Sequence, residues 1–77
     1  MDRRIERLKW RSRRGLLELD LVFEKFWARE AALSEADMAA LERLLAMPDN
    51  DLLDLVMGRA QADDPVIRAA LKTLGAV

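Results

Sequence analysis

The sequence predicts an all-α protein, a small single-domain five-helix bundle formed by residues 1–77. Apolar residues recur every three to four positions, no segment alternates apolar and polar residues with period two, and β-branched residues are few. Glycine, proline and capping residues divide the chain into five short segments joined by short connections, which favours helices packed in a bundle. Of the 77 residues, 52% are hydrophobic and 35% are charged, which fits one domain with a thin core.

The first predicted helix covers about residues 2–12, with Ile5 and Leu8 on one face. Gly15 interrupts the helical pattern, because glycine lowers helix stability by about 1 kcal/mol relative to alanine and readily adopts positive φ. The second predicted helix runs from about Leu16 to Arg29. Its apolar residues follow the 3.6-residue period and form a buried stripe: Leu16, Leu19, Phe23, Phe26 and Trp27.

Capping residues predict where the remaining three helices begin and end. Ser34 is a predicted N-cap with Asp37 in the capping-box position, which begins a helix over about residues 35–46. Asp49 or Asn50 is expected to cap a short fourth helix that ends before Gly58. Asp64-Pro65 is a cap followed by a first-turn proline and opens a fifth helix that Gly75 closes. The residues expected in the core are Met38, Leu41, Leu44 and Leu45, then Leu52, Leu53, Leu55 and Val56, then Ile67, Ala70, Leu71 and Leu74.

Composition excludes several kinds of site. The sequence contains no cysteine, so it has no disulfide framework and no thiolate chemistry. It contains no histidine, which excludes zinc sites of the usual kind, histidine general bases and Ser-His triads. No apolar run approaches the roughly 18 residues of a membrane span, and no apolar signal core follows the basic N-terminus.

The charges divide the chain into a basic head and an acidic body. Residues 1–14 hold seven basic and two acidic residues, a net +5, whereas residues 15–77 hold six basic and twelve acidic residues, a net −6. The first interpretation of the head is a solvated amphipathic helix whose arginine stems cover part of the bundle. A protein-binding surface comes next, and a nucleic-acid or membrane-surface helix last. The acidic body argues against nucleic acid, because it repels phosphate.

The carboxylates do not suggest catalysis. Glu18 and Asp20 lie two positions apart, so on a helix they diverge by about 200° and cannot act as a pair. Arg14 and Glu18 are four apart, and spacing alone favours an ion pair between them if helical geometry continues through Gly15. Asp49, Asn50 and Asp51 lack the spacing of a calcium loop, which leaves capping as the simpler interpretation. We therefore expect no catalytic residue, no metal site and no enzymatic activity.

One stretch resembles a known family. WRSRRGLLELD (residues 10–20) is followed by Phe23 and Phe26, then by LS at 33–34, LL at 44–45 and DNDLLDLVMG at 49–58. This pattern, over about residues 4–60, resembles the succinate dehydrogenase assembly factors, or flavinator proteins, also described in bacteria as the antitoxin CptB. Its core is the RGxxE motif, here Arg14-Gly15-Leu16-Leu17-Glu18. RGxxE alone is a weak signal, whereas RRGxLELD with DxDLxxxxxG downstream on a short helical chain is specific.

The resemblance implies a helical flavinator-type domain that acts in the cytoplasm of bacteria. It implies binding to the flavoprotein subunit of succinate dehydrogenase or fumarate reductase while FAD becomes covalently attached to that subunit, with no FAD held firmly by this chain. The predicted partner-binding residues are Arg13, Arg14, Gly15, Glu18 and Asp20. Within this set Asp20 is expected to support the surface, and the adjacent Leu19 is expected to point inward.

The residues of the motif fit a docking surface. Glycine has no side chain, so another protein's backbone could approach closely at Gly15. Arg14 offers a planar set of donors and Glu18 an acceptor. Covalent flavin is usually attached through histidine, cysteine or tyrosine, and the sequence contains none of the three, so the flavin must be attached to a partner. Two alternatives remain open: an antitoxin or regulatory protein whose basic head binds a toxin, a cytoskeletal protein or nucleic acid, and a helical adaptor without any connection to flavin.

Overall fold

The computed structural model describes residues 3–29 and 32–75 of the chain. This part forms α1 (Arg3–Arg11), α2 (Leu17–Ala28), α3 (Glu35–Leu45), α4 (Asp49–Val56) and α5 (Pro65–Leu74), and it holds no strand. The predicted all-α fold with five helices is confirmed. The first three helices end within one residue of the expected bounds.

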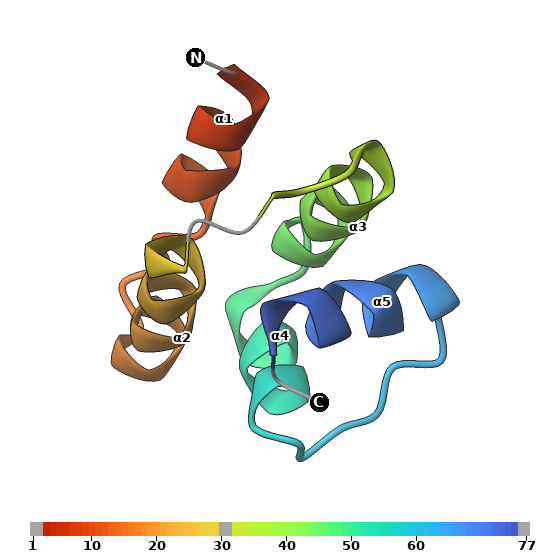
Figure 1. The fold of residues 1–77 in the computed structure, drawn as a ribbon. Helices are drawn as coiled ribbons and strands as arrows, with labels where there is room; N and C mark the ends of the chain where they lie inside the picture. The colour runs from red at the N-terminus through yellow and green to blue at the C-terminus, as the bar shows by residue number, and fades with distance from the viewer. Residues whose placement is uncertain (1–2, 30–31, 76–77) are drawn as a thin grey trace.

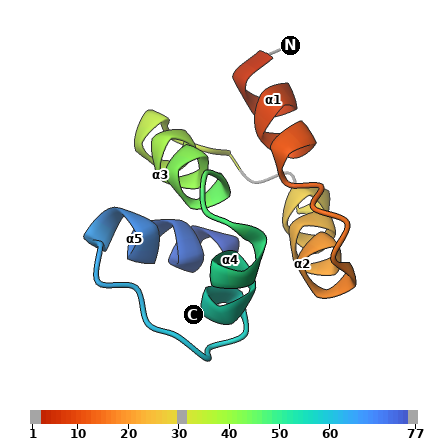
Figure 2. The ribbon, with the colours of Figure 1, turned by 180° about the vertical axis from the view of Figure 1, so that it is seen from behind.

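The helices form two groups that face each other across the core. In both views α1 and α2 lie on one side of the molecule, and α3, α4 and α5 lie on the other (Figure 1, Figure 2). The most extensive helix contact is between α3 and α5, while α1 packs on α3, and α2 packs on both α4 and α5. The connection between α1 and α2 therefore lies at the edge of the bundle.

The core is built largely from leucines of all five helices, together with the two phenylalanines of α2. Its largest fully buried side chains are Phe23, Leu8, Leu19, Leu41, Leu44 and Leu52. Burying one such side chain contributes about 1.5–3 kcal/mol to the stability of the fold. These buried side chains therefore hold the two groups of helices together. Four of the residues expected to be buried are only partly so, because they lie at the margin of the core: Ile5, Leu16, Trp27 and Leu53.

Most of the predicted caps are confirmed. The Ser34 side chain accepts from the Asp37 N–H at 3.0 Å and the Asp37 carboxylate accepts from the Ser34 N–H at 3.0 Å, which completes the capping box. Asp64 caps α5 with Pro65 in the first turn, and Gly58 follows α4 with φ +78°.

The predicted cap of α4 is wrong. The helix begins at Asp49, the N-cap position is Pro48, and no side chain caps it. Asp49 is already the first residue of the helix, so it does not occupy the cap position, and its carboxylate pairs with an arginine from another part of the chain, described below.

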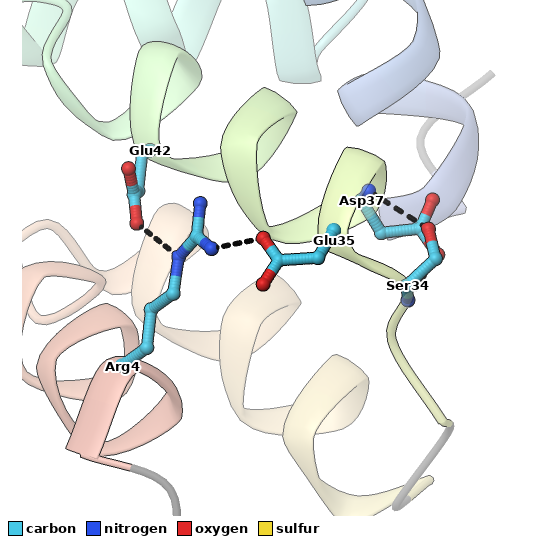
Figure 3. Close-up of polar contacts among 5 residues, drawn as sticks. All are labelled: Arg4, Ser34, Glu35, Asp37 and Glu42. Atoms are coloured by element: carbon cyan, nitrogen blue, oxygen red, sulfur yellow. Dashed lines mark hydrogen bonds and ion pairs between the residues drawn. The ribbon is translucent and has the colours of Figure 1, made fainter.

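Arginines join the two groups of helices, and two of them, Arg4 and Arg29, lie outside the connection between α1 and α2. Arg4 of α1 reaches across to α3, where its Nε lies 2.7 Å from Glu42 Oε1 and its Nη1 contacts Glu35 (Figure 3). The hydrogen bond with Glu42, followed by that with Glu35, raises the pKa of the Arg4 guanidinium. Arg29, at the end of α2, donates to the carbonyl oxygens of Leu74 at 3.0 Å and Thr73 at 3.4 Å, so it binds the C-terminal end of α5.

Within residues 3–29 and 32–75, no helix combines the length and the apolar character that crossing a membrane requires.

The capping box at Ser34 leads to a prediction about acid stability. The Ser34 N–H, then the Ser34 side chain, lower the pKa of the Asp37 carboxyl below its ordinary value of about 3.9. Because the folded pKa is lowered, this contribution to stability is complete above about pH 4 and is lost as the pH falls through the folded pKa. We expect Asp37→Asn to lose less stability than the wild type between about pH 4 and pH 2, as measured by urea unfolding.

The control is Asp63→Asn, which removes an exposed carboxylate whose side chain makes no polar contact within the described residues. Equal acid sensitivity of the two variants would contradict the assignment to Asp37.

Candidate functional site

The predicted site lies on the connection between α1 and α2, called here the Gly15 loop (residues 12–16). The Ser12 N–H donates to the Leu8 carbonyl oxygen at 3.0 Å, which closes the last turn of α1. Gly15 has φ +77°, a backbone conformation that side-chain-bearing residues rarely adopt. Gly15 is exposed, and a Cβ atom added there would meet nothing within 4 Å. Glycine is therefore required here by the backbone, and it leaves the surface of the loop open.

Arg14 points from this loop toward the junction of α3 and α4. Its Nη2 donates to the Leu45 carbonyl oxygen, and its Nη1 lies 3.5 Å from the Met47 carbonyl oxygen and 3.2 Å from Asp49 Oδ1. The side chain is only 17% exposed. A guanidinium at the C-terminal end of a helix satisfies carbonyl groups that have no partner within the helix and complements the helix dipole.

Asp20, in the first turn of α2, holds the other side of the loop. Its Oδ1 accepts a hydrogen bond from the Arg14 N–H at 3.0 Å. Arg14 is thus fixed through its backbone to α2 and through its side chain to the junction of α3 and α4. The two contacts together set the position of Gly15, the next residue.

Arg13 and Glu18 are both exposed, on either side of Gly15 in the sequence, whereas Leu19 is fully buried, as expected. The expected ion pair between Arg14 and Glu18 is wrong. The helical pattern is interrupted between Arg11 and Leu17, so a spacing of four residues does not bring the two side chains together. Arg14 pairs instead with Asp49, 35 positions further along the chain.

A groove of about 600 Å³ runs beside the loop, and we call it the Gly15 groove. Its basic residues belong to the end of α1 and to the loop, and its acidic residues belong to α2. The Trp27 indole N–H donates to Ser12 Oγ at 3.1 Å, which links the two sides. The full lining consists of Lys9, Ser12, Arg13, Gly15, Asp20, Phe23, Glu24 and Trp27.

Sequence reasoning did not find Lys9, Ser12, Glu24 or Asp49 as parts of this region. Lys9 lies over the Trp27 ring, with Nζ 5.7 Å from its centroid, and Ser12 is buried. Helical periodicity does not signal these contacts, because they join residues at least 15 positions apart in the sequence. Only the isolated serine in a run of arginines was a visible hint.

The site is a polar surface with groups of both charges. It offers guanidinium and ammonium donors, carboxylate acceptors and an unobstructed glycine. Within the described residues no group of three or more histidine, cysteine, aspartate or glutamate residues could hold a metal ion.

Residues 6–77 match the protein family described as "Flavinator of succinate dehydrogenase". The chain belongs to this family. The match includes the Gly15 loop and continues through α5, beyond the residues that carried the motif. The resemblance seen in the sequence is therefore confirmed.

Relatives of the flavinator family support the same assignment. The "FAD assembly factor SdhE" of Ralstonia nicotianae is 47% identical over 76 residues, which cover 92% of this chain and 80% of the relative. The protein of that name in Legionella pneumophila (strain Lens) is 39% identical, covering 86% of this chain and 85% of its own. The one in Pseudomonas putida is 34% identical, covering 91% and 84%. Comparison with solved structures gave no match.

Proposed function

We propose that this protein binds the flavoprotein subunit of succinate dehydrogenase, or of fumarate reductase, in the cytoplasm and promotes covalent attachment of FAD to that subunit. The family description and the names of the relatives support a role in flavinylation. The observation that carries the docking assignment is the open surface at Gly15, next to the Gly15 groove and flanked in the sequence by exposed Arg13 and Glu18.

The shape and charge of this surface suit a protein partner. At Gly15 the partner's backbone can approach without meeting a side chain. Arg13 supplies a guanidinium for a carboxylate or a carbonyl oxygen, and Glu18 supplies an acceptor. Basic residues on one side of the groove and acidic residues on the other favour one orientation of a bound segment, since the reverse orientation would juxtapose like charges.

The covalent chemistry belongs to the partner. The sequence has no histidine, cysteine or tyrosine, the side chains through which flavin is usually attached. The role proposed for this protein is to hold the flavoprotein in a conformation that aligns its acceptor side chain with the flavin. Alignment of two reacting groups can lower a barrier by several kcal/mol without any catalytic residue in the helper protein. FAD is then a cofactor of the partner, and this protein is a non-enzymatic assembly factor.

A second candidate function rests on the outer face of α1. Among the described residues of this helix, Arg3, Arg7 and Arg11 have no hydrogen bond or ion pair through their side chains, and Trp10 is 76% exposed. Such a face could bind a toxin, a cytoskeletal protein or nucleic acid, which is the regulatory alternative.

Gly15→Arg tests the docking assignment. We expect complex formation to be lost and covalent FAD on the co-expressed flavoprotein subunit to fall to the level seen without this protein. The measurement is flavin fluorescence of the denatured subunit, produced in a host that lacks its own assembly factor. Full flavinylation by this variant would show that the Gly15 surface is not the docking site.

The matched control is Gly58→Arg. Gly58 has φ +78°, is exposed, and has nothing within 4 Å of an added Cβ, so its environment repeats that of Gly15. The backbone strain of about 1–2 kcal/mol should be similar in both variants. Cooperative thermal unfolding of both, with loss of flavinylation in Gly15→Arg alone, separates docking from stability.

Glu18→Ala tests the exposed acceptor that follows Gly15 in the sequence. We expect the affinity for the flavoprotein subunit to fall by more than the twofold or so that an exposed ion pair of about 0.5 kcal/mol would explain. Calorimetry measures the affinity. Asp51→Ala is the control, because Asp51 is also an exposed acidic residue in the first turn of a helix. Equal effects of the two substitutions would remove Glu18 from the docking surface.

A salt titration separates the two candidate functions. We expect no DNA or RNA binding at micromolar protein concentration and physiological salt, because the body of the molecule is acidic. Micromolar binding with a steep decrease of log K against log salt concentration would favour the regulatory alternative.

A further inference from the structure

We propose that Asp49, acting through Arg14, is a positioning residue that holds the Gly15 loop in its docking conformation. The inference rests on the proposed function, since it concerns the loop assigned to docking. It also assigns different roles to the two arginines that precede Gly15. Arg13 contacts the partner, whereas Arg14 keeps the loop in place.

The first step concerns the direction of Arg14. Both of its Nη atoms are engaged by the α3–α4 junction, through the Leu45 and Met47 carbonyl oxygens and the Asp49 carboxylate. Its Nε is buried and has no partner within the described residues. A partner protein could bind this guanidinium only after displacing these contacts, whereas the exposed Arg13 needs no such change.

The second step concerns Asp49. This residue stands at the first position of α4, where an aspartate side chain at the preceding position would normally cap the helix. The cap position is occupied by Pro48, which provides no side-chain cap, and the carboxylate of Asp49 lies 3.2 Å from Arg14 Nη1. The Asp49 carboxylate therefore pairs with a residue of the Gly15 loop.

The third step connects this contact to Gly15. The Arg14 N–H is held by Asp20 at 3.0 Å, and the Arg14 side chain is held by Asp49 and the end of α3. Gly15 follows directly, with φ +77°, and a Cβ atom added there would meet nothing within 4 Å. The two ends of the loop are anchored separately, one to Trp27 and the other to the core. Between these ends, the contacts of Arg14 fix the backbone next to Gly15.

The experiment compares Asp49→Asn with Asp54→Asn. Both aspartates belong to α4, both pair with an arginine at similar distance (3.2 Å and 3.1 Å), and both are about half exposed (45% and 48%). Asp54 pairs with Arg59, which has no connection to the Gly15 loop. The two substitutions thus remove the same charge from the same helix, and each breaks one pair between an aspartate and an arginine.

Two measurements are made on each variant. In the free protein, nuclear magnetic resonance records the chemical shift and hydrogen exchange of the Gly15 amide. In the presence of the flavoprotein subunit, calorimetry records the dissociation constant. For Asp49→Asn we expect a shifted Gly15 signal, at least threefold faster exchange and binding weakened roughly tenfold. For Asp54→Asn we expect neither change, with similar melting temperatures for both variants.

Equal behaviour of the two variants at the Gly15 amide would overturn the inference, whether or not the flavoprotein binds. A shifted amide in Asp49→Asn with unchanged affinity would also overturn it, since the loop would then not need to be positioned. If Gly15→Arg abolishes binding and Asp49→Asn does not weaken it, only the positioning role fails. If Gly15→Arg binds normally, the docking assignment of the proposed function fails instead.

A further pair of variants tests the division between the two arginines. Arg14→Lys keeps the charge but loses the planar arrangement of donors, and it is expected to shift the Gly15 amide and to weaken binding. Arg13→Ala is expected to weaken binding while the Gly15 amide signal of the free protein stays in place. The reverse pattern would contradict the assignment.

Discussion

The contact between Arg14 and the α3–α4 junction is the interaction on which the candidate site depends. The end of α3 presents carbonyl groups that its own helix cannot satisfy, and the Arg14 guanidinium satisfies those of Leu45 and Met47 together with the Asp49 carboxylate. An arginine suits this position better than a lysine, because its donors lie in one plane and can bind several acceptors at once.

Much of the fold follows from local sequence signals, and the contacts of the site do not. The capping box at Ser34, the Asp64-Pro65 pair and Gly58 each act within four residues, so the sequence was sufficient to predict them. The buried stripes follow from helical periodicity in the same way. Local spacing favours Glu18 as the partner of Arg14, but the acceptors of the Arg14 side chain lie 31 to 35 positions away in the sequence. The cap of α4 is a second case, because Asp49 is the first residue of the helix and its carboxylate pairs with that distant arginine.

The basic head is also less uniform than its sequence suggests. Arg4 and Arg14 bind acceptors on the α3–α4 side of the bundle, so part of the positive charge is paired with carboxylates of the same chain. The arginines on the outer face of α1, and Arg13 in the loop, keep their charge exposed. The head therefore divides into arginines that join the helices and arginines that remain available at the surface. The order of residues alone could not separate the two kinds.

The pair of arginines at the two ends of α2 has a consequence for recognition. Arg14 precedes α2 and binds the end of α3, and Arg29 follows α2 and binds the end of α5, so the helix is attached to the opposite group at both ends. Sliding or tilting of α2 would break charged hydrogen bonds at one end or the other. The surface beside it is thus ordered in the free protein, so that binding there would not spend conformational entropy on arranging it. A molecule that bound on this side would meet a backbone already in place, and little backbone change of this chain is expected.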